Sequence, residues 1–122
     1  MWVSGERRVR RSDDRLQALQ FLFATQRERA ALSHLLVATE DGILVAHDGD
    51  TDECEELAAY APFVARGAGM AIDPRRITGV TAHAFPVDGQ ELYLLLRSES
   101  PKVDAIPAAL TAIQGAIRIL GR

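Results

Sequence analysis

An Asp-Gly pair between two short apolar segments constrains the fold of this chain more than any other feature. Asp41-Gly42 lies between residues 33–39 (SHLLVAT) and residues 43–47 (ILVAH). A two-residue type I′ turn needs positive φ at both positions, which Asp-Gly tolerates well. The sequence therefore predicts two antiparallel strands joined by a tight turn.

This turn also predicts which residues of the hairpin face each other. A two-residue loop would pair Ala38 with Val45 and Leu36 with His47. Side chains alternate between the two faces of a strand, and here both faces carry mainly apolar residues. A hairpin with one wet face would alternate apolar and polar residues. We therefore expect a sheet that is covered on both sides.

The remaining segments predict three helices and a second hairpin. Ser12 is placed to cap the first helix, and Asp88-Gly89 predicts the second hairpin turn. Pro62 predicts a kink within the middle helix, and Pro86 the end of the third strand. The predicted elements are helix 13–29, strands 33–39 and 43–47, helix 52–70, strands 77–85 and 91–98, and a last helix opened by Pro101.

This order, α-β-β-α-β-β-α, predicts an α/β/α sandwich with a mainly antiparallel sheet. Two helices should cover one face of the sheet and the alanine-rich middle helix the other. In the last helix, apolar residues repeat with 3-4 spacing, which predicts a stripe packed on the core, or alternatively a coiled-coil seam. The stripe consists of Val103, Ile106, Leu110, Ile113, Ile117 and Leu120. The single middle helix is narrow for four strands, so we expect a partner molecule to complete its face.

Composition and charge fit one globular domain. The chain has 122 residues, of which 48% are apolar and 25% charged, which is ordinary for a globular domain. We expect a single domain at 13–122, preceded at 1–12 by a flexible basic arm that lacks the apolar core of a signal peptide. The net charge of −3 gives no electrostatic case for nucleic acid or anionic membranes, and the apolar runs are too short to span a bilayer. A cytoplasmic location is the expectation.

A run of acidic residues after the first hairpin suggests either a calcium loop or a helix start. An EF-hand loop that began at Asp48 would need Gly at its sixth position and Glu at its twelfth, where this chain has Glu53 and Ala59. A helix start accounts for the run better. Asp52 can cap the middle helix with Glu55 at its third position, as in a capping box.

Other candidate chemistry is weak. His34 and His47 fall on one sheet face, and a zinc site would also need His83. Cys54 lacks an identifiable base and is the only cysteine, so no internal disulfide is possible. The glycines of 67–69 end a helix and make no dinucleotide fingerprint. The sequence therefore predicts no metal, no cofactor and no catalytic residues.

The pattern resembles the Roadblock/LC7 domain family over residues 13–120. The resemblance rests on HLLVATEDGILVAHDGDTDECEELAAYAPFVARGAG (residues 34–69), a hairpin followed by an acidic helix start and an alanine-rich helix. It continues in ELYLLLRSES (residues 91–100) and the closing amphipathic helix. The family has five strands, whereas this chain shows four unless Gly79 divides the third, and Pro62 interrupts the helix that the family uses for dimerisation.

What the resemblance implies is a homodimer with one sheet continuous across both subunits. The middle helix and an edge strand would form its interface. Carried over by position, the interface residues are Leu57, Tyr60, Ala61, Val64, Ala65, Val80, Thr81, Ala82 and His83.

The resemblance also implies a function: a non-enzymatic module that regulates or scaffolds a small Ras-like GTPase, directly or through another Roadblock protein. For bacterial relatives this concerns cell polarity and gliding motility. An arginine finger is not expected, and the candidates nearest the interface are Arg66, Arg75 and Arg76. Two alternatives of other classes are a PAS- or profilin-like small-molecule sensor and a hydrolase with zinc on the three histidines.

Overall fold

The described residues form three helices and four strands in the predicted order. The computed structural model describes residues 2–67, 72–98, 100 and 105–121. The elements are α1 (Trp2–Arg29), β1 (Leu32–Thr39), β2 (Leu44–Asp48), α2 (Thr51–Ala65), the 3₁₀ turn η2 (Pro74–Arg76), β3 (Val80–Val87), β4 (Gln90–Ser98) and α3 (Ile106–Leu120).

The four strands form one antiparallel sheet in the order β2-β1-β4-β3. Its two central strands come from opposite halves of the chain, with Leu35 of β1 opposite Leu96 of β4. The segment from 72 to 79 adds no fifth strand, because η2 and a turn occupy its middle and end.

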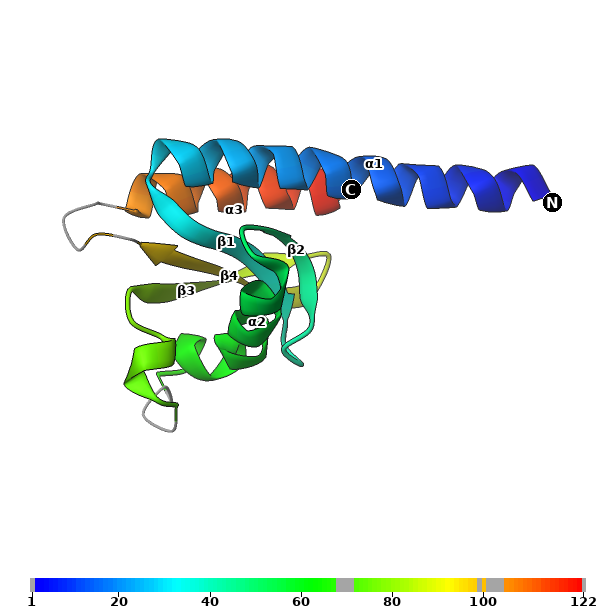
Figure 1. The fold of residues 1–122 in the computed structure, drawn as a ribbon. Helices are drawn as coiled ribbons and strands as arrows, with labels where there is room; N and C mark the ends of the chain where they lie inside the picture. The colour runs from blue at the N-terminus through cyan, green and yellow to red at the C-terminus, as the bar shows by residue number, and fades with distance from the viewer. Residues whose placement is uncertain (1, 68–71, 99, 101–104, 122) are drawn as a thin grey trace.

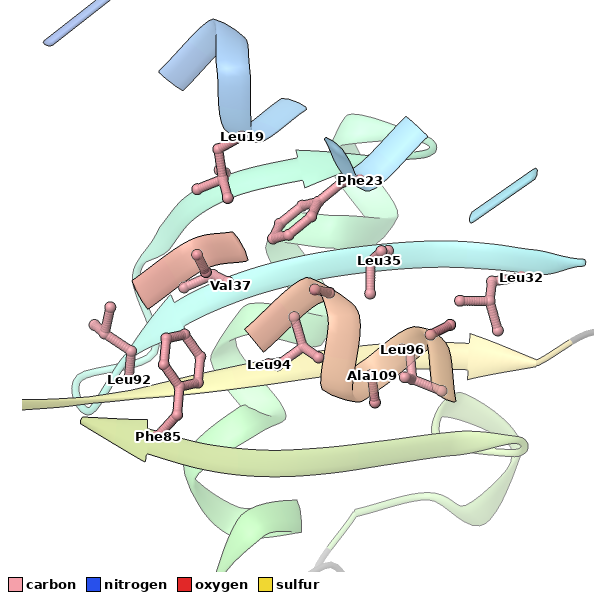
Figure 2. Packing of buried hydrophobic residues seen from close by; sticks show 14 of the residues in the cluster. Leu19, Phe23, Leu32, Leu35, Val37, Phe85, Leu92, Leu94, Leu96 and Ala109 are labelled. Carbon is pink, nitrogen blue, oxygen red and sulfur yellow. The ribbon is translucent and has the colours of Figure 1, made fainter. Parts of the chain in front are cut away.

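Helices α1 and α3 lie side by side on one face of the sheet (Figure 1). Figure 2 shows how Leu19 and Phe23 of α1 point toward Val37 of β1, with Leu94 of β4 and Ala109 of α3 in the same core. All five side chains are buried. This layer is therefore a closely packed apolar core.

Of the described helices, only α2 covers the opposite face (Figure 1). Its inward side is built from Cys54, Leu57, Ala58 and Ala61, which pack against the sheet with Leu36, Ala38, Tyr93 and Leu95. The predicted sandwich, with two helices on one face and the middle helix on the other, is confirmed.

The first hairpin turn differs from the prediction by one residue. Thr39 N donates to Ile43 O at 2.9 Å, so residues 40–42 form a three-residue loop with Gly42 at φ +80°. Leu36 pairs with His47 as predicted, but Ala38 pairs with Leu44, because the register shifts between Val37 and Ala38. The second turn is the predicted two-residue one, with positive φ at both of its residues, and it joins Val87 to Gln90.

Two predicted helix boundaries are wrong. Helix α1 begins at Trp2 and includes residues 2–12, so Ser12 lies inside it and cannot be its N-cap. The flexibility of that arm stays a prediction. Helix α2 ends at Ala65 rather than 70, and it continues unbroken through Pro62, whose carbonyl accepts from Arg66 N at 3.2 Å. Pro101 and Val103 lie outside the described residues.

The core-facing prediction for the last helix holds for Ile113 and Leu120, which pack against the core, and is wrong for the three most exposed residues of the stripe. The large residues Ile106, Leu110 and Ile117 are 62%, 55% and 40% exposed. The buried side of α3 is made instead of Ala108, Ala109, Ala112, Gly115 and Ala116. A Cβ atom at Gly115 would lie 2.2 Å from Leu22 Cδ2, so α3 approaches α1 through its smallest residues. Close packing against α1 therefore decides which side of α3 turns inward.

Candidate functional site: the open sheet edge beside α2

The acidic run before α2 is a helix start, with a different cap from the predicted one. Asp50 Oδ1 accepts a hydrogen bond from Glu53 N at 2.9 Å, so the N-cap is Asp50 and not Asp52. Asp48 pairs with Arg27 of α1. Asp48 therefore ties β2 to α1, and Asp50 caps α2.

The three histidines do not come together. His47 lies on β2 and His83 on β3, the two opposite edges of the sheet. His34 is buried on β1, with its Nε2 2.6 Å from Glu53 Oε2 and its Nδ1 2.7 Å from Ser33 Oγ. In the described part of the chain, no three His, Cys, Asp or Glu residues are grouped as metal ligands.

Cys54 lies on the inward side of α2 and is fully buried against the sheet. Burial and the nearby carboxylates of Asp50, Asp48 and Glu53 raise the pKa of its thiol to about 12. A thiol that keeps its proton at neutral pH is a poor nucleophile. Cys54 is therefore part of the core.

The surface hollows found among the described residues are open to solvent. One of about 320 Å³ lies between the end of α1 and the start of α3, lined by Gln26, Arg29, Pro107 and Thr111 among others. Another of about 250 Å³ lies at the second hairpin, around Phe85 and Glu91. Neither is the enclosed apolar pocket that a small-molecule sensor would need.

The most distinctive surface is the free edge of β3. Val87 and Gln90 flank a two-residue turn and form a hydrogen-bonded pair, and such pairs recur at every second residue. The bond from Ser98 N to Gly79 O at 3.0 Å keeps that alternation at the other end. The N–H groups of Ala82 and Ala84 consequently point away from β4, toward the open edge.

The position of Pro86 in β3 fits the same alternation of backbone N–H groups between β4 and the open edge. The prediction that it ends the third strand is wrong, because β3 continues through Pro86 to Val87. Proline lacks an N–H group and is accepted in an edge strand where that group would face solvent. At position 86 the missing N–H is on the open side, so the ladder to β4 is intact.

The other edge of the sheet is less suited to pairing. Strand β2 has five residues, against eight in β3, and its register with β1 is shifted near its start. Short and bulged edge strands are poor templates for a further strand. Of the two edges, β3 is the one that offers a regular row of backbone groups.

The structure divides the nine predicted interface residues into two groups. Leu57 and Ala61 are buried under α2, and Val80, Ala82 and Ala65 pack against that same core. Val80, Ala82 and Ala65 are only partly buried, as are Tyr60, Val64 and His83, and Thr81 is exposed. Phe63, which sequence reasoning missed, is 50% exposed on the outer side of α2. Its spacing of three from Tyr60 was the available signal.

A polar network joins α2 to the segment before β3. Arg76 and the Tyr60 hydroxyl both donate to Glu56 Oε1, the latter at 3.1 Å. These two hydrogen bonds lower the pKa of Glu56, and the first raises that of Arg76. Arg97 Nε donates to Thr78 O at 3.1 Å. These bonds tie the segment before β3 to α2 through Arg76 and to β4 through Arg97.

The arginines near this surface are placed differently. Arg76 forms an ion pair with Glu56. The side chain of Arg75 is 93% exposed, and its Nε lies 3.7 Å from Asp73 Oδ1. Arg66 is exposed at the end of α2.

No helix within the described residues combines the length and the apolar character needed to cross a membrane.

Comparison with known proteins reveals similarity in structure and not in sequence. No protein-family model and no curated protein matches the sequence. MglB from Myxococcus xanthus superposes with a TM-score of 0.54 at 12% identity, covering 83% of this chain and 93% of that one. A structure described as MglB with a tetrameric arrangement gives 0.57 at 14% identity, covering 87% and 90%. A Roadblock/LC7 domain from Streptomyces avermitilis gives 0.56 at 14% identity, covering 82% and 92%. With its three helices and antiparallel sheet, this chain has the Roadblock/LC7 fold.

Proposed function

We propose that this chain is a homodimeric interaction module without enzymatic activity, which regulates or scaffolds a small Ras-like GTPase. It would act on the GTPase directly or through another Roadblock protein. The observation that carries the proposal is the open β3 edge, flanked on one side by the partly exposed Tyr60 and Val64 of α2. The resemblance to Roadblock/LC7 domains supplies the class of partner.

In the proposed dimer, β3 pairs antiparallel with β3 of a second copy. The outward N–H groups of Ala82 and Ala84 would donate across the two-fold axis and make one continuous sheet. Two copies of the α2 face would then lie on the same side of that sheet. This gives the partner protein a surface twice as wide as one subunit offers.

The proposal that the chain is not an enzyme has its own support. The Cys54 thiol is buried and protonated, His34 and His47 contact neighbouring side chains, and Asp48 and Asp50 serve structural contacts. A regulator needs no chemistry of its own. By binding one nucleotide state more tightly, it shifts the GTPase toward that state by the difference in affinity.

The proposal also includes a cytoplasmic location and a role in bacterial cell polarity and gliding motility. They rest on the family resemblance and on the similarity to two MglB structures. The alternative of a small-molecule sensor has no specific observation in its favour.

The dimer is tested by the substitution Ala84→Pro. It removes one outward N–H at an exposed position and leaves the ladder to β4 intact. Sedimentation equilibrium should show a dimer for the wild type and at least tenfold weaker association for Ala84→Pro. Ala84→Thr keeps the N–H group at the same position and should remain dimeric. A wild-type monomer would refute the proposed dimer.

The GTPase is tested by calorimetry with a Ras-like GTPase from the same genome, loaded with GDP or with a non-hydrolysable GTP analogue. Preference for one state would establish a nucleotide-dependent regulator. Binding only to another Roadblock protein would establish the indirect form of the proposal. A chain that binds neither would contradict it.

A further inference from the structure

The outward side of α3 is an apolar surface that the proposed strand pairing does not use. Ile106, Leu110 and Ile117 are more than one-third exposed, and Ile113 between them is only partly buried. We call these four residues the α3 stripe. Contiguous exposed apolar residues on a small protein mark sites that another surface covers.

The spacing of the stripe indicates what kind of element covers it. Its residues follow each other at intervals of four, three and four, as the a and d positions of a coiled-coil seam do. The structure turns the small residues of α3 toward the core, so the helices of the described part of the chain leave Leu110 and Ile117 of this seam uncovered. Side chains with this spacing fit between those of a second helix.

The stripe lies on the side of α3 that faces away from α1. The opposite side adjoins α1, because Leu22 contacts Gly115 and a shared hollow is lined by Gln26 and Thr111. Helix α1 packs over β1 and β2, whereas α3 packs over β3 and β4. The stripe is therefore next to the open edge of the sheet, on the opposite face from α2.

Strand spacing then indicates which helix would be the partner. Neighbouring strands are about 4.8 Å apart, so helices that each cover two strands are separated by about 10 Å. That is the separation of directly packed helices. If β3 pairs with β3 of a second copy, the next helix along this face is α3 of that copy, at the same spacing.

The charges are consistent with a second copy. Arg118 is the only charged residue among the described residues 105–121, and helical spacing puts it about 100° around the helix from Ile117, outside the stripe. Two copies of the stripe meet without repulsion between like charges, and nothing on it would attract a charged partner.

We infer that the α3 stripe packs against the α3 stripe of a second copy as an antiparallel helix pair, forming a second half of the homodimer interface. This inference rests on the proposed pairing of β3. It adds a helix seam on the opposite side of the sheet from α2. The dimer would thus be held by backbone hydrogen bonds at the sheet edge and by side-chain packing above it.

The test compares Leu110→Glu with a matched control. Leu110 is already 55% exposed in the single chain, so the substitution should leave the fold intact, as circular dichroism would verify. Phe21→Glu is the control, because Phe21 is 77% exposed on α1 and lies outside the stripe. In sedimentation equilibrium, Leu110→Glu should raise the dimer dissociation constant at least tenfold, and Phe21→Glu should leave it unchanged.

Cross-linking measures the contact directly. Leu110→Cys treated with a bismaleimide spanning about 10 Å should yield covalent dimers, whereas Phe21→Cys should not. The buried Cys54 provides little background reaction. Absence of cross-linked dimers would count against the helix pair.

The outcomes separate the inference from the proposed function. If Ala84→Pro weakens the dimer and Leu110→Glu does not, the strand pairing stands and the α3 seam is refuted. If Leu110→Glu abolishes GTPase binding with an unchanged dimer, the stripe binds the GTPase and the inference is again wrong. A wild-type monomer refutes both.

Discussion

Near the start of α2, Asp50 is the N-cap and Cys54 is a buried core residue. The sequence indicated these roles only in part. The acidic run pointed to a helix start, and this was correct. The choice of cap was wrong by two residues, because Gly49 lets the chain turn earlier than expected, with φ +120° and little room beside Ser33 O. A capping pattern can fit two overlapping registers, and tertiary contacts select one.

The thiol of Cys54 makes stability depend on alkaline pH. Its pKa is raised from 9.0 to about 12, first by burial and then by Asp50 and Asp48. Between these values the native thiol keeps its proton while the unfolded one loses it, so unfolding releases a proton. The free energy of unfolding should therefore fall as the pH rises above about 9, by up to about 1.4 kcal/mol per pH unit.

The measurement is urea denaturation at several pH values between 8 and 11 for the wild type and Cys54→Ala. The variant retains the other titrating groups, so its curve should be flatter by the contribution of the thiol. If the free energy of unfolding of the two proteins changed with pH in parallel, the pKa of Cys54 would be the same in the folded and unfolded states.

At the scale of elements, the start of β3 depends on a glycine that approaches β4 closely. Gly79 has φ +75°, and a Cβ atom there would lie 2.8 Å from Ser98 O. Gly67 has the same φ but nothing within 4 Å of its Cβ position. Both changes to alanine carry the left-handed backbone cost of roughly 1–2 kcal/mol. Gly79→Ala should be the more destabilising by at least about 1 kcal/mol, measured by chemical denaturation.

Equal losses for the two variants would mean that Ser98 moves aside without cost. A Gly79→Ala protein as stable as the wild type would show that the backbone at this turn is not held at positive φ.

The elements differ in how much of them the sequence could predict. Strands β1 and β4 were readily predicted, because long apolar segments bounded by turn residues have few other interpretations. The exposed stripe of α3 was not, because periodicity identifies the apolar side of a helix without saying what covers it. Here the close contact between Gly115 and Leu22 decided the orientation, and it depends on the distance between two helices.

The candidate site was predictable in outline and not in detail. The sequence indicated the middle helix and the third strand, and the structure places β3 at an open edge. The sequence assigned Leu57 and Ala61 to the interface, whereas in the structure they face the sheet and Phe63 faces outward. In an alanine-rich helix the two sides have similar hydrophobicity, so the inward side is set by packing.

At the scale of the whole molecule, the first turns of α1 extend beyond the other elements (Figure 1). The described core contacts of this helix begin at Leu16 and Leu19. Deletion of residues 1–12 should consequently leave the melting temperature within about 2 °C of the wild type, because this end of the helix extends beyond the rest of the fold. Deletion of 1–19 removes the fully buried Leu19 and should lower it clearly. Calorimetry of both truncated proteins would measure these melting temperatures. A large decrease on deletion of residues 1–12 would show that the arm stabilises the domain.

The order of the strands has a consequence for how the chain is made. Strand β1 is one of the two central strands, and one of its neighbours, β4, lies far along the chain, with Leu32 opposite Ser98. Ribosomal synthesis proceeds from the N-terminus, so β1 emerges with apolar residues on both faces well before β4 exists. Contacts between such distant segments form slowly. The apolar strand β1 therefore remains without its partner β4 until the last third of the chain is synthesised. During this interval the nascent chain is most prone to aggregate and to bind chaperones.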